Sequence, residues 1–134
     1  MQIRPSLVAF VMVVTLAHRA SAQAATAASN SLGVWRGRSL CLVKPSSCHD
    51  EVAVYRITGV RGSDSIAVDA RKIVDGQEEE MGVLACTIAA RGASITCAMR
   101  NGVWHFTTRG DSLVGELRLP DHTKFRDVRA VRSH

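Results

Sequence analysis

The chain has 134 residues, with 17 Lys and Arg against 12 Asp and Glu and a formal net charge of +5. That length accommodates one domain. Aromatic residues make up only 4% of the chain, and the basic residues are scattered singly among acids. The sequence therefore lacks the stacking platform and the basic patch of a nucleic-acid-binding protein, and we expect the charge to be solvated surface.

The first segment, residues 1–22, has the pattern of a secretory signal peptide. Arg4 precedes an apolar run from Leu7 to Val14, and the segment ends in Ala20-Ser21-Ala22, an A-x-A cleavage site. The run is too short to remain as a membrane-spanning helix. Cleavage removes two basic residues and no acid, which leaves a net charge of +3. We expect a secreted or periplasmic protein with no membrane span in its mature form.

The next segment, residues 23–31, contains only small and polar residues. Such a segment cannot bury enough apolar surface to offset the entropy of ordering it. We therefore predict a disordered leader, followed by a single domain over residues 32–134. A leader of this kind can also be functional, since some exported inhibitors place one in a protease cleft.

Four cysteines in a short exported chain indicate disulfides. A zinc site would need close C-x-x-C pairs or an H-x₃₋₅-H partner, and neither occurs. We expect no metal and no cofactor. Sequence alone leaves three connectivities open, and we favour Cys41–Cys48 and Cys86–Cys97.

From Leu32 onward, turn-forming residues recur at short intervals and separate segments of alternating apolar character. Asp75-Gly76 and Asn101-Gly102 are hairpin dipeptides, and we expect the first hairpin to be lengthened by a solvated tip at residues 77–80. The predicted strands are Gly33–Val43, Glu51–Gly59, Ser65–Val74, Met81–Ala90, Ala93–Arg100, Val103–Arg109, Ser112–Leu119 and Lys124–Arg132.

Eight strands joined by short turns favour a meander in which each strand pairs with its neighbour in sequence. Closing such a sheet removes its two edges, and eight antiparallel strands enclose room for packed side chains or one small ligand. We predict an all-β fold, an antiparallel up-and-down barrel held by disulfides. The alternative is a β-sandwich.

The second cysteine pair tests the register. In a hairpin centred between Arg91 and Gly92, Cys86 faces Cys97. Opposed cysteines are bridged best at a non-hydrogen-bonded position, where strands approach more closely. A four-residue loop at residues 90–93 makes Cys86–Cys97 a non-hydrogen-bonded pair, whereas a two-residue turn makes it a hydrogen-bonded pair. We therefore predict the longer loop.

Gly33-x-Trp35 opens the first predicted strand and resembles the start of lipocalin-like (calycin) barrels. In those families the Trp closes one end of the barrel and a basic residue of the last strand lies across it. The resemblance implies this role for Trp35 and for one of Arg126, Arg129 and Arg132, of which we take Arg129. The chain is much shorter than typical lipocalins and lacks their C-terminal helix.

Trp104 and Phe106 share one face of the sixth predicted strand. With Tyr55 and Leu117 they are the candidate lining of a small apolar pocket. His49-Asp50-Glu51 could ligate a metal or act as acid and base, but neighbours on a strand point to opposite faces. We interpret them as a solvated turn in which Asp50 caps backbone N–H groups.

Two functions remain open. The first is an exported barrel that binds a small apolar or amphipathic molecule. The alternative is an exported protein-binding module, such as a hydrolase or protease inhibitor, acting through residues 23–31 or through the loops at 44–51 and 75–80. The chain contains no G-x-S-x-G, phosphate-loop, dinucleotide or H-E-x-x-H motif. We therefore do not expect an enzyme.

Overall fold

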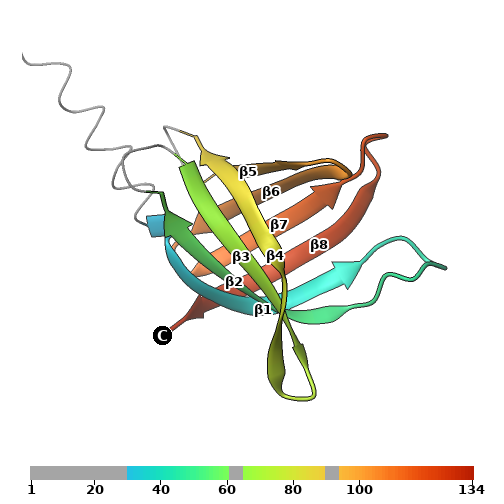
Figure 1. The fold of residues 1–134 in the computed structure, drawn as a ribbon, viewed down its shortest axis with the longest axis horizontal. Coiled ribbons are helices and arrows are strands. Elements are labelled where there is room, and N and C mark those ends of the chain that lie inside the picture. Colours follow the sequence, from blue (N-terminus) through green and yellow to red (C-terminus); the bar gives the residue numbers. More distant parts are fainter. Residues whose placement is uncertain (1–29, 61–64, 90–93) are drawn as a thin grey trace, which may run out of the picture.

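A computed structural model of the chain describes residues 30–60, 65–89 and 94–134. Eight antiparallel strands follow one another around a closed barrel, and the last pairs with the first (Figure 1). The prediction of an eight-stranded antiparallel barrel is confirmed, and the alternative of a β-sandwich is wrong. The strands are β1 (Gly33–Cys41), β2 (Glu51–Gly59), β3 (Ser65–Val74), β4 (Gln77–Ile88), β5 (Ser94–Met99), β6 (Gly102–Arg109), β7 (Ser112–Arg118) and β8 (Lys124–Ser133).

Several sequence-based predictions lie outside the described residues: the signal peptide at 1–22, most of the leader at 23–29 and the loop at 90–93. Residues 61–64, between the second and third predicted strands, also lie outside them. Ser31, which we expected in the leader, is described and fully buried. Its Oγ lies 2.8 Å from Oγ1 of Thr108. The packed domain thus includes Ser31, before the expected boundary at Leu32. No helix in the described ranges is long and apolar enough to cross a membrane.

The hairpin between β3 and β4 is tighter than expected. It turns at Asp75 and Gly76, which adopt φ values of 50° and 79°, as a two-residue hairpin requires. β4 begins at Gln77, so residues 77–80 extend the strand and do not lengthen the turn, although they are exposed as expected. Ion pairs with neighbouring strands account for the difference, because Glu78 lies 2.8 Å from Arg56 and Glu79 lies 3.7 Å from Lys72.

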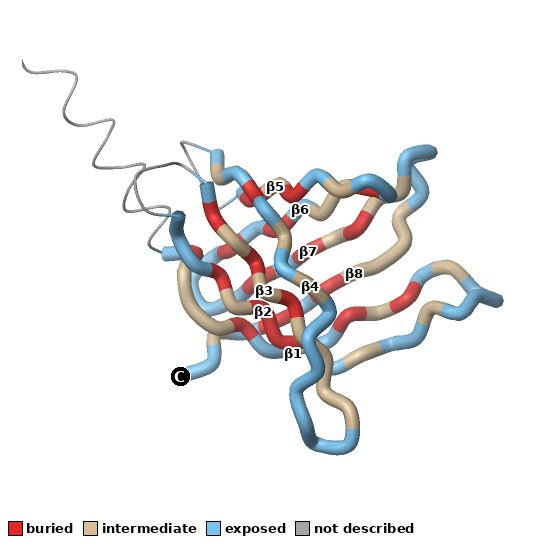
Figure 2. The backbone as a smooth tube through the Cα atoms, viewed as in Figure 1, coloured by how far each residue is buried: buried red, intermediate tan, exposed pale blue. Residues whose placement is uncertain are grey.

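Alternation along the strands fills the interior, and Figure 2 shows buried and exposed positions following each other along most strands. The largest fully buried side chains include Trp35, Tyr55, Phe106, Ile57 and Leu113. Gly37 is also part of this interior pattern on β1. A Cβ atom there would lie 2.0 Å from the backbone oxygen of Arg129, so the close approach of β1 and β8 depends on this glycine.

One end of the barrel is closed by Trp35, which is fully buried. Its indole N–H donates to the Ser31 carbonyl at 3.0 Å, and the guanidinium of Arg132 lies 4.2 Å from its ring centroid. Our choice of Arg129 as the closing residue is wrong. Val128 and Ala130 point inward and Arg129 points outward, with a side chain 76% exposed against 21% for Arg132. Strand alternation places Arg132 on the inner face.

Both favoured disulfides are present, Cys41–Cys48 and Cys86–Cys97. Thr87 pairs with Thr96, so Cys86 directly faces Cys97 as predicted. The N–H of Ala89 donates to the carbonyl of Ser94, and counting back from that pair makes Cys86–Cys97 a non-hydrogen-bonded position. The Cα atoms are accordingly only 4.2 Å apart.

Candidate functional site

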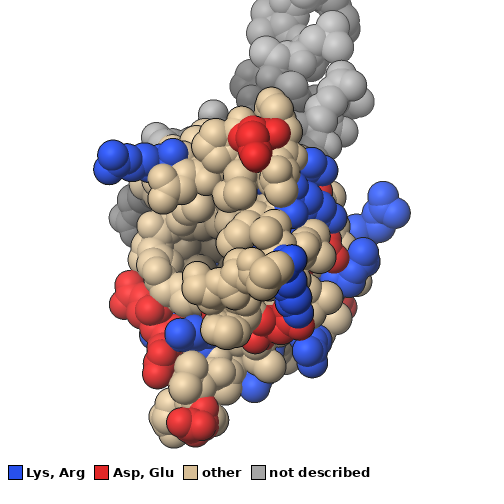
Figure 3. All heavy atoms as spheres, turned by 90° about the vertical axis from the view of Figure 1, so that its right-hand side faces the viewer, with Lys and Arg blue, Asp and Glu red and all other residues tan. Residues whose placement is uncertain are grey.

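The end of the barrel opposite Trp35 contains a cavity. We call it the open end; it is bordered by the β1–β2 loop at residues 42–50, the β3–β4 turn and the β7–β8 connection at 119–123. Figure 3 looks onto this end and shows the hollow, with charged side chains of both signs around it. The cavity has a volume of about 170 Å³.

Most of the cavity wall is apolar, and it comes from β2 to β6. All but one of these residues are placed there because every second side chain points into a barrel. Met81 is the exception, since it lies at the register shift between β3 and β4 and is 43% exposed. The apolar lining is formed by Tyr55, Ala70, Met81, Leu84, Met99 and Trp104. Such a wall suits an apolar ligand group.

The aromatic residues form one stack beneath and beside the cavity. Trp104 and Phe106 are parallel within 7°, with ring centroids 5.2 Å apart. Tyr55 tilts against Phe106 at 5.4 Å. Phe106 is fully buried one inward position deeper than Trp104. The stack gives the cavity a rigid floor, because each ring restrains the next.

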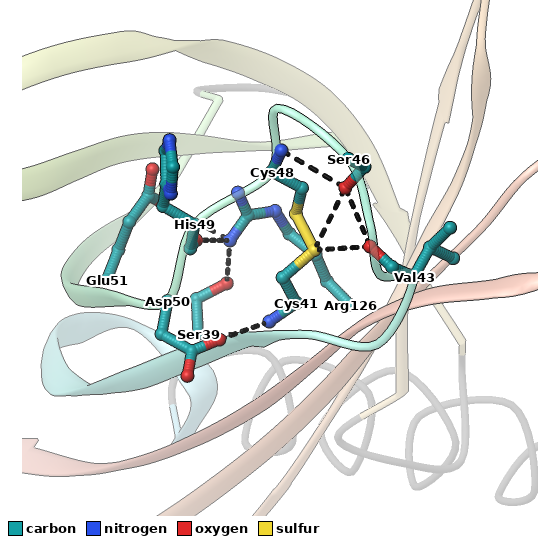
Figure 4. Close-up of a disulfide and its surroundings, with 9 residues drawn as sticks. All are labelled: Ser39, Cys41, Val43, Ser46, Cys48, His49, Asp50, Glu51 and Arg126. Carbon is teal, nitrogen blue, oxygen red and sulfur yellow. Dashed lines mark hydrogen bonds and ion pairs between the residues drawn. A yellow bond between two sulfur atoms is a disulfide. The ribbon is translucent and has the colours of Figure 1, made fainter.

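A polar cluster stands at one side of the cavity, contributed by β1, β2 and β8 (Figure 4). Nη1 of Arg126 donates to Ser39 Oγ at 3.0 Å and to the His49 carbonyl at 3.2 Å. The same nitrogen lies 3.4 Å from the carboxylate of Glu51. The arginine charge is therefore already balanced by a carboxylate, and the cluster offers hydrogen-bonding groups without a net charge of its own.

The loop at residues 42–50 is fixed to the barrel by the Cys41–Cys48 disulfide and by two side chains (Figure 4). Ser46 Oγ donates to the Val43 carbonyl at 2.6 Å. Asp50 accepts a hydrogen bond of 2.8 Å from the N–H of Cys41, and this bond lowers the pKa of the Asp50 carboxyl. The loop thus forms a defined rim beside the cavity.

Burial raises the pKa of the Tyr55 phenol to about 12, against a smaller opposing effect of its hydrogen bond with Ser39. Tyr55 is therefore neutral over the physiological range, and its hydroxyl can serve as a hydrogen-bonding group at the meeting point of the apolar wall and the polar cluster.

The four residues proposed as a pocket are distributed over two environments. Tyr55 and Trp104 line the cavity. Phe106 lies deeper, within the core. Leu117 is buried on β7, opposite Trp104 in the ladder. The sequence reasoning missed the polar cluster and both methionines, although Met99 has the same parity as Cys97 and could have been assigned to the interior by alternation.

His49, Asp50 and Glu51 do not converge on one point. Asp50 caps the Cys41 N–H as predicted, while His49 offers its carbonyl and Glu51 its carboxylate to Arg126. Among the residues that the structure describes, no group of three potential ligands is arranged to hold a metal ion.

Comparisons with models of known protein families, with curated protein sequences and with solved structures find no match to this chain. The fold is compatible with a lipocalin-like barrel, and the geometry of the open end is the basis for inferring what the protein does.

Proposed function

We propose that this protein is an exported barrel that binds a small apolar or amphipathic molecule at its open end, without catalysing a reaction on it. The observation that carries the proposal is the cavity of about 170 Å³ between the aromatic stack and the polar cluster. The two disulfides suit an oxidising compartment outside the cytoplasm, and secretion or a periplasmic location is part of the proposal.

The size of the cavity limits the buried part of the ligand. An apolar cavity of about 150 Å³ accepts one benzene ring, so a single ring or a chain of a few carbons fits here. Because the cavity opens to solvent, a longer ligand can extend beyond the rim. The neutral cluster of Ser39, Glu51 and Arg126 favours an uncharged polar group, such as a hydroxyl or an amide, over a free carboxylate.

Binding can be measured by NMR with methionines labelled at the ε-methyl carbon, because two of the four methionines, Met81 and Met99, line the cavity. We would titrate the oxidised protein with benzyl alcohol and with benzoate as the charged counterpart. Benzyl alcohol should shift both methyl signals in a saturable way, and benzoate should bind more weakly. An absence of saturable shifts with any small apolar probe would contradict the proposal.

A matched pair of variants locates the site. Ala70 faces the cavity and Ala67 faces outward on the same strand. Ala70→Leu should fill the cavity and weaken benzyl alcohol binding by about tenfold or more, the effect expected when well over 1 kcal/mol of apolar contact is lost. Ala67→Leu should leave the affinity unchanged. Equal effects of the two changes would place the binding site elsewhere.

A further inference from the structure

The barrel wall is least continuous between β4 and β5. Their ladder contains only the pairs Thr87–Thr96 and Ile88–Ile95 in the described part of the chain, whereas β4 pairs with β3 from Gln77 to Thr87. Figure 1 shows the two strands diverging from the end where the Cys86–Cys97 disulfide joins them. Most of β4 is thus paired on one side only.

The backbone groups facing this divergence can be identified. Ala89 donates its N–H to Ser94, and in an antiparallel ladder hydrogen-bonded positions alternate. The N–H and C=O groups of Thr87, Ala85 and Val83 therefore point toward β5. The register would place Ala85 opposite Ala98, but the ladder ends at Thr87 and Thr96. Ala85 and Val83 present main-chain donors and acceptors to the divergence.

The surface around these groups is hollowed and apolar. A groove of about 410 Å³ follows the outer face here, and Val83, Ala85 and Ala98 contribute to it. Val83 is 60% exposed. An exposed apolar residue on an open strand edge favours pairing with another chain. Leu84 lines both this groove and the cavity, so the two hollows meet at the same side chain of β4.

The position of β5 determines what kind of occupant fits. Because β5 flanks the divergence on its other side and is itself paired with β6 through Cys97–Trp104, the wall of a second folded barrel would collide with it. A single extended chain has no such second layer. Glu80 lies on β4 opposite Arg71, and it has no ion pair within the described ranges, unlike Glu78 and Glu79.

We propose that the unpaired edge of β4 at Met81–Ala85 binds an extended peptide segment of a partner protein by strand addition. The peptide pairs its main chain with Val83 and Ala85, directs alternate apolar side chains toward Leu84 and the cavity, and places a basic residue near Glu80. Main-chain hydrogen bonds supply affinity in this mode, and the pockets for alternate side chains supply specificity.

The test is amide hydrogen exchange of the full, oxidised chain, followed by NMR. The probe is the peptide acetyl-Val-Thr-Val-Thr-Val-Lys-Lys-amide, which places lysines near Glu80 when it runs antiparallel to β4. Without peptide, the amides of Val83 and Ala85 should exchange much faster than that of Leu84, which faces β3. At about 1 mM peptide, a concentration suited to weak recognition, exchange of Val83 and Ala85 should slow by about tenfold or more.

Two controls isolate the main chain and the charge. The first control uses two peptides that are N-methylated at alternate residues, one at the valines and the other at the threonines. N-methylation keeps the side chains and removes the main-chain N–H donors. At least one should lose binding, and equal binding of all three peptides would overturn the proposal. Glu80→Gln should weaken binding severalfold and reduce its salt dependence, while Glu79→Gln, at a carboxylate already paired with Lys72, should have less effect.

Other results would also overturn it. Slow exchange of Val83 and Ala85 without peptide, independent of protein concentration, would mean that the edge is already satisfied. Exchange of Val83 and Ala85 that becomes slower as the protein concentration rises would assign the edge to a second copy of the chain. Peptide binding without protection of these amides would place the peptide elsewhere. The methionine titration with benzyl alcohol on the same sample reports separately on the cavity, so failure of one proposal is distinguishable from failure of the other.

Discussion

The two ends of the barrel use similar residues for different purposes. At the closed end, Trp35 is fully buried, its indole N–H is bonded to Ser31, and Arg132 covers its ring. At the open end, Trp104 is only half-buried and borders a cavity. Both tryptophan side chains point into the interior of the barrel. What differs is whether neighbouring strands supply side chains that fill the space around them.

The contrast extends to the arginines of β8. Arg132 closes one end by contacting an aromatic face and the carbonyl of Leu32 at 2.8 Å. Arg126, also inward-facing on the same strand, is held by Ser39 and Glu51 beside the cavity. The closed end is organised for stability. The open end leaves apolar surface and hydrogen-bonding groups accessible, an arrangement typical of binding sites.

The largest effect should come from truncating the tryptophan of the closed end. Trp35→Ala should lower the free energy of unfolding by about 3–5 kcal/mol, because it removes a fully buried aromatic side chain and leaves a cavity. Trp104→Ala should cost only about 1–2 kcal/mol, since less of its surface is removed from water. Urea denaturation with a constant m-value gives both numbers. Equal losses would show that the two ends do not differ in packing.

The disulfides should rank next. Replacing Cys86 and Cys97 together by Ala should destabilise by roughly 3–4 kcal/mol, as expected for a bridge that also fills core space. These cysteines are buried and join the two strands with the shortest ladder. Replacing Cys41 and Cys48 should cost about 2 kcal/mol, because this bridge closes a smaller loop at the surface. The reverse order in thermal unfolding would contradict the assignment of β4 and β5 as the weakest part of the wall.

A smaller difference in stability is expected between variants of two arginines of β8. Arg132→Met should destabilise by about 1–2 kcal/mol through loss of the contact with Trp35 and of its hydrogen bonds. Arg129→Met should change stability by less than about 0.5 kcal/mol, as is usual for an exposed side chain. Chemical denaturation of the two variants tests the pair directly. A larger loss at Arg129 would restore our original choice of closing residue.

The smallest effect concerns the loop of the open end and depends on pH. The pKa of Asp50 is lowered in the folded protein by the Cys41 N–H, so its contribution is fully present above the ordinary value of 3.8 and is lost as pH falls through the lower, folded-state value. The amide signal of Cys41 should therefore titrate below that ordinary value. In Asp50→Asn the titration should vanish while the loop keeps its hydrogen bond. A persistent titration would assign the effect to another carboxyl.

The fold could be predicted from the sequence because the determining signals are local. Period-two alternation and short turns specify a meander, and the spacing of Cys86 and Cys97 around a hairpin centre specifies one register. The start of β4 could not be predicted, since it depends on ion pairs that Glu78 and Glu79 make with neighbouring strands.

The candidate site was predictable only in part, for a related reason. Tyr55 and Trp104 stand out as large inward-facing residues of their own strands. Ser39, Glu51 and Arg126 come together only because β8 pairs with β1, and the two strands are the most distant in sequence. The same pairing places Arg132 directly opposite Trp35. Strand alternation limits the arginine that covers Trp35 to Arg126 or Arg132. Only the pairing register between β1 and β8 decides between them.

The closed end also brings the two boundaries of the described domain together. Asn30 is bonded through its carbonyl to Arg132, and the C-terminus lies at the same end (Figure 1). A fusion partner, an affinity tag or a solid support joined at His134 is therefore attached on the side opposite the cavity. Immobilisation through the C-terminus should present the open end to solution in a uniform orientation, which is favourable for a biosensor.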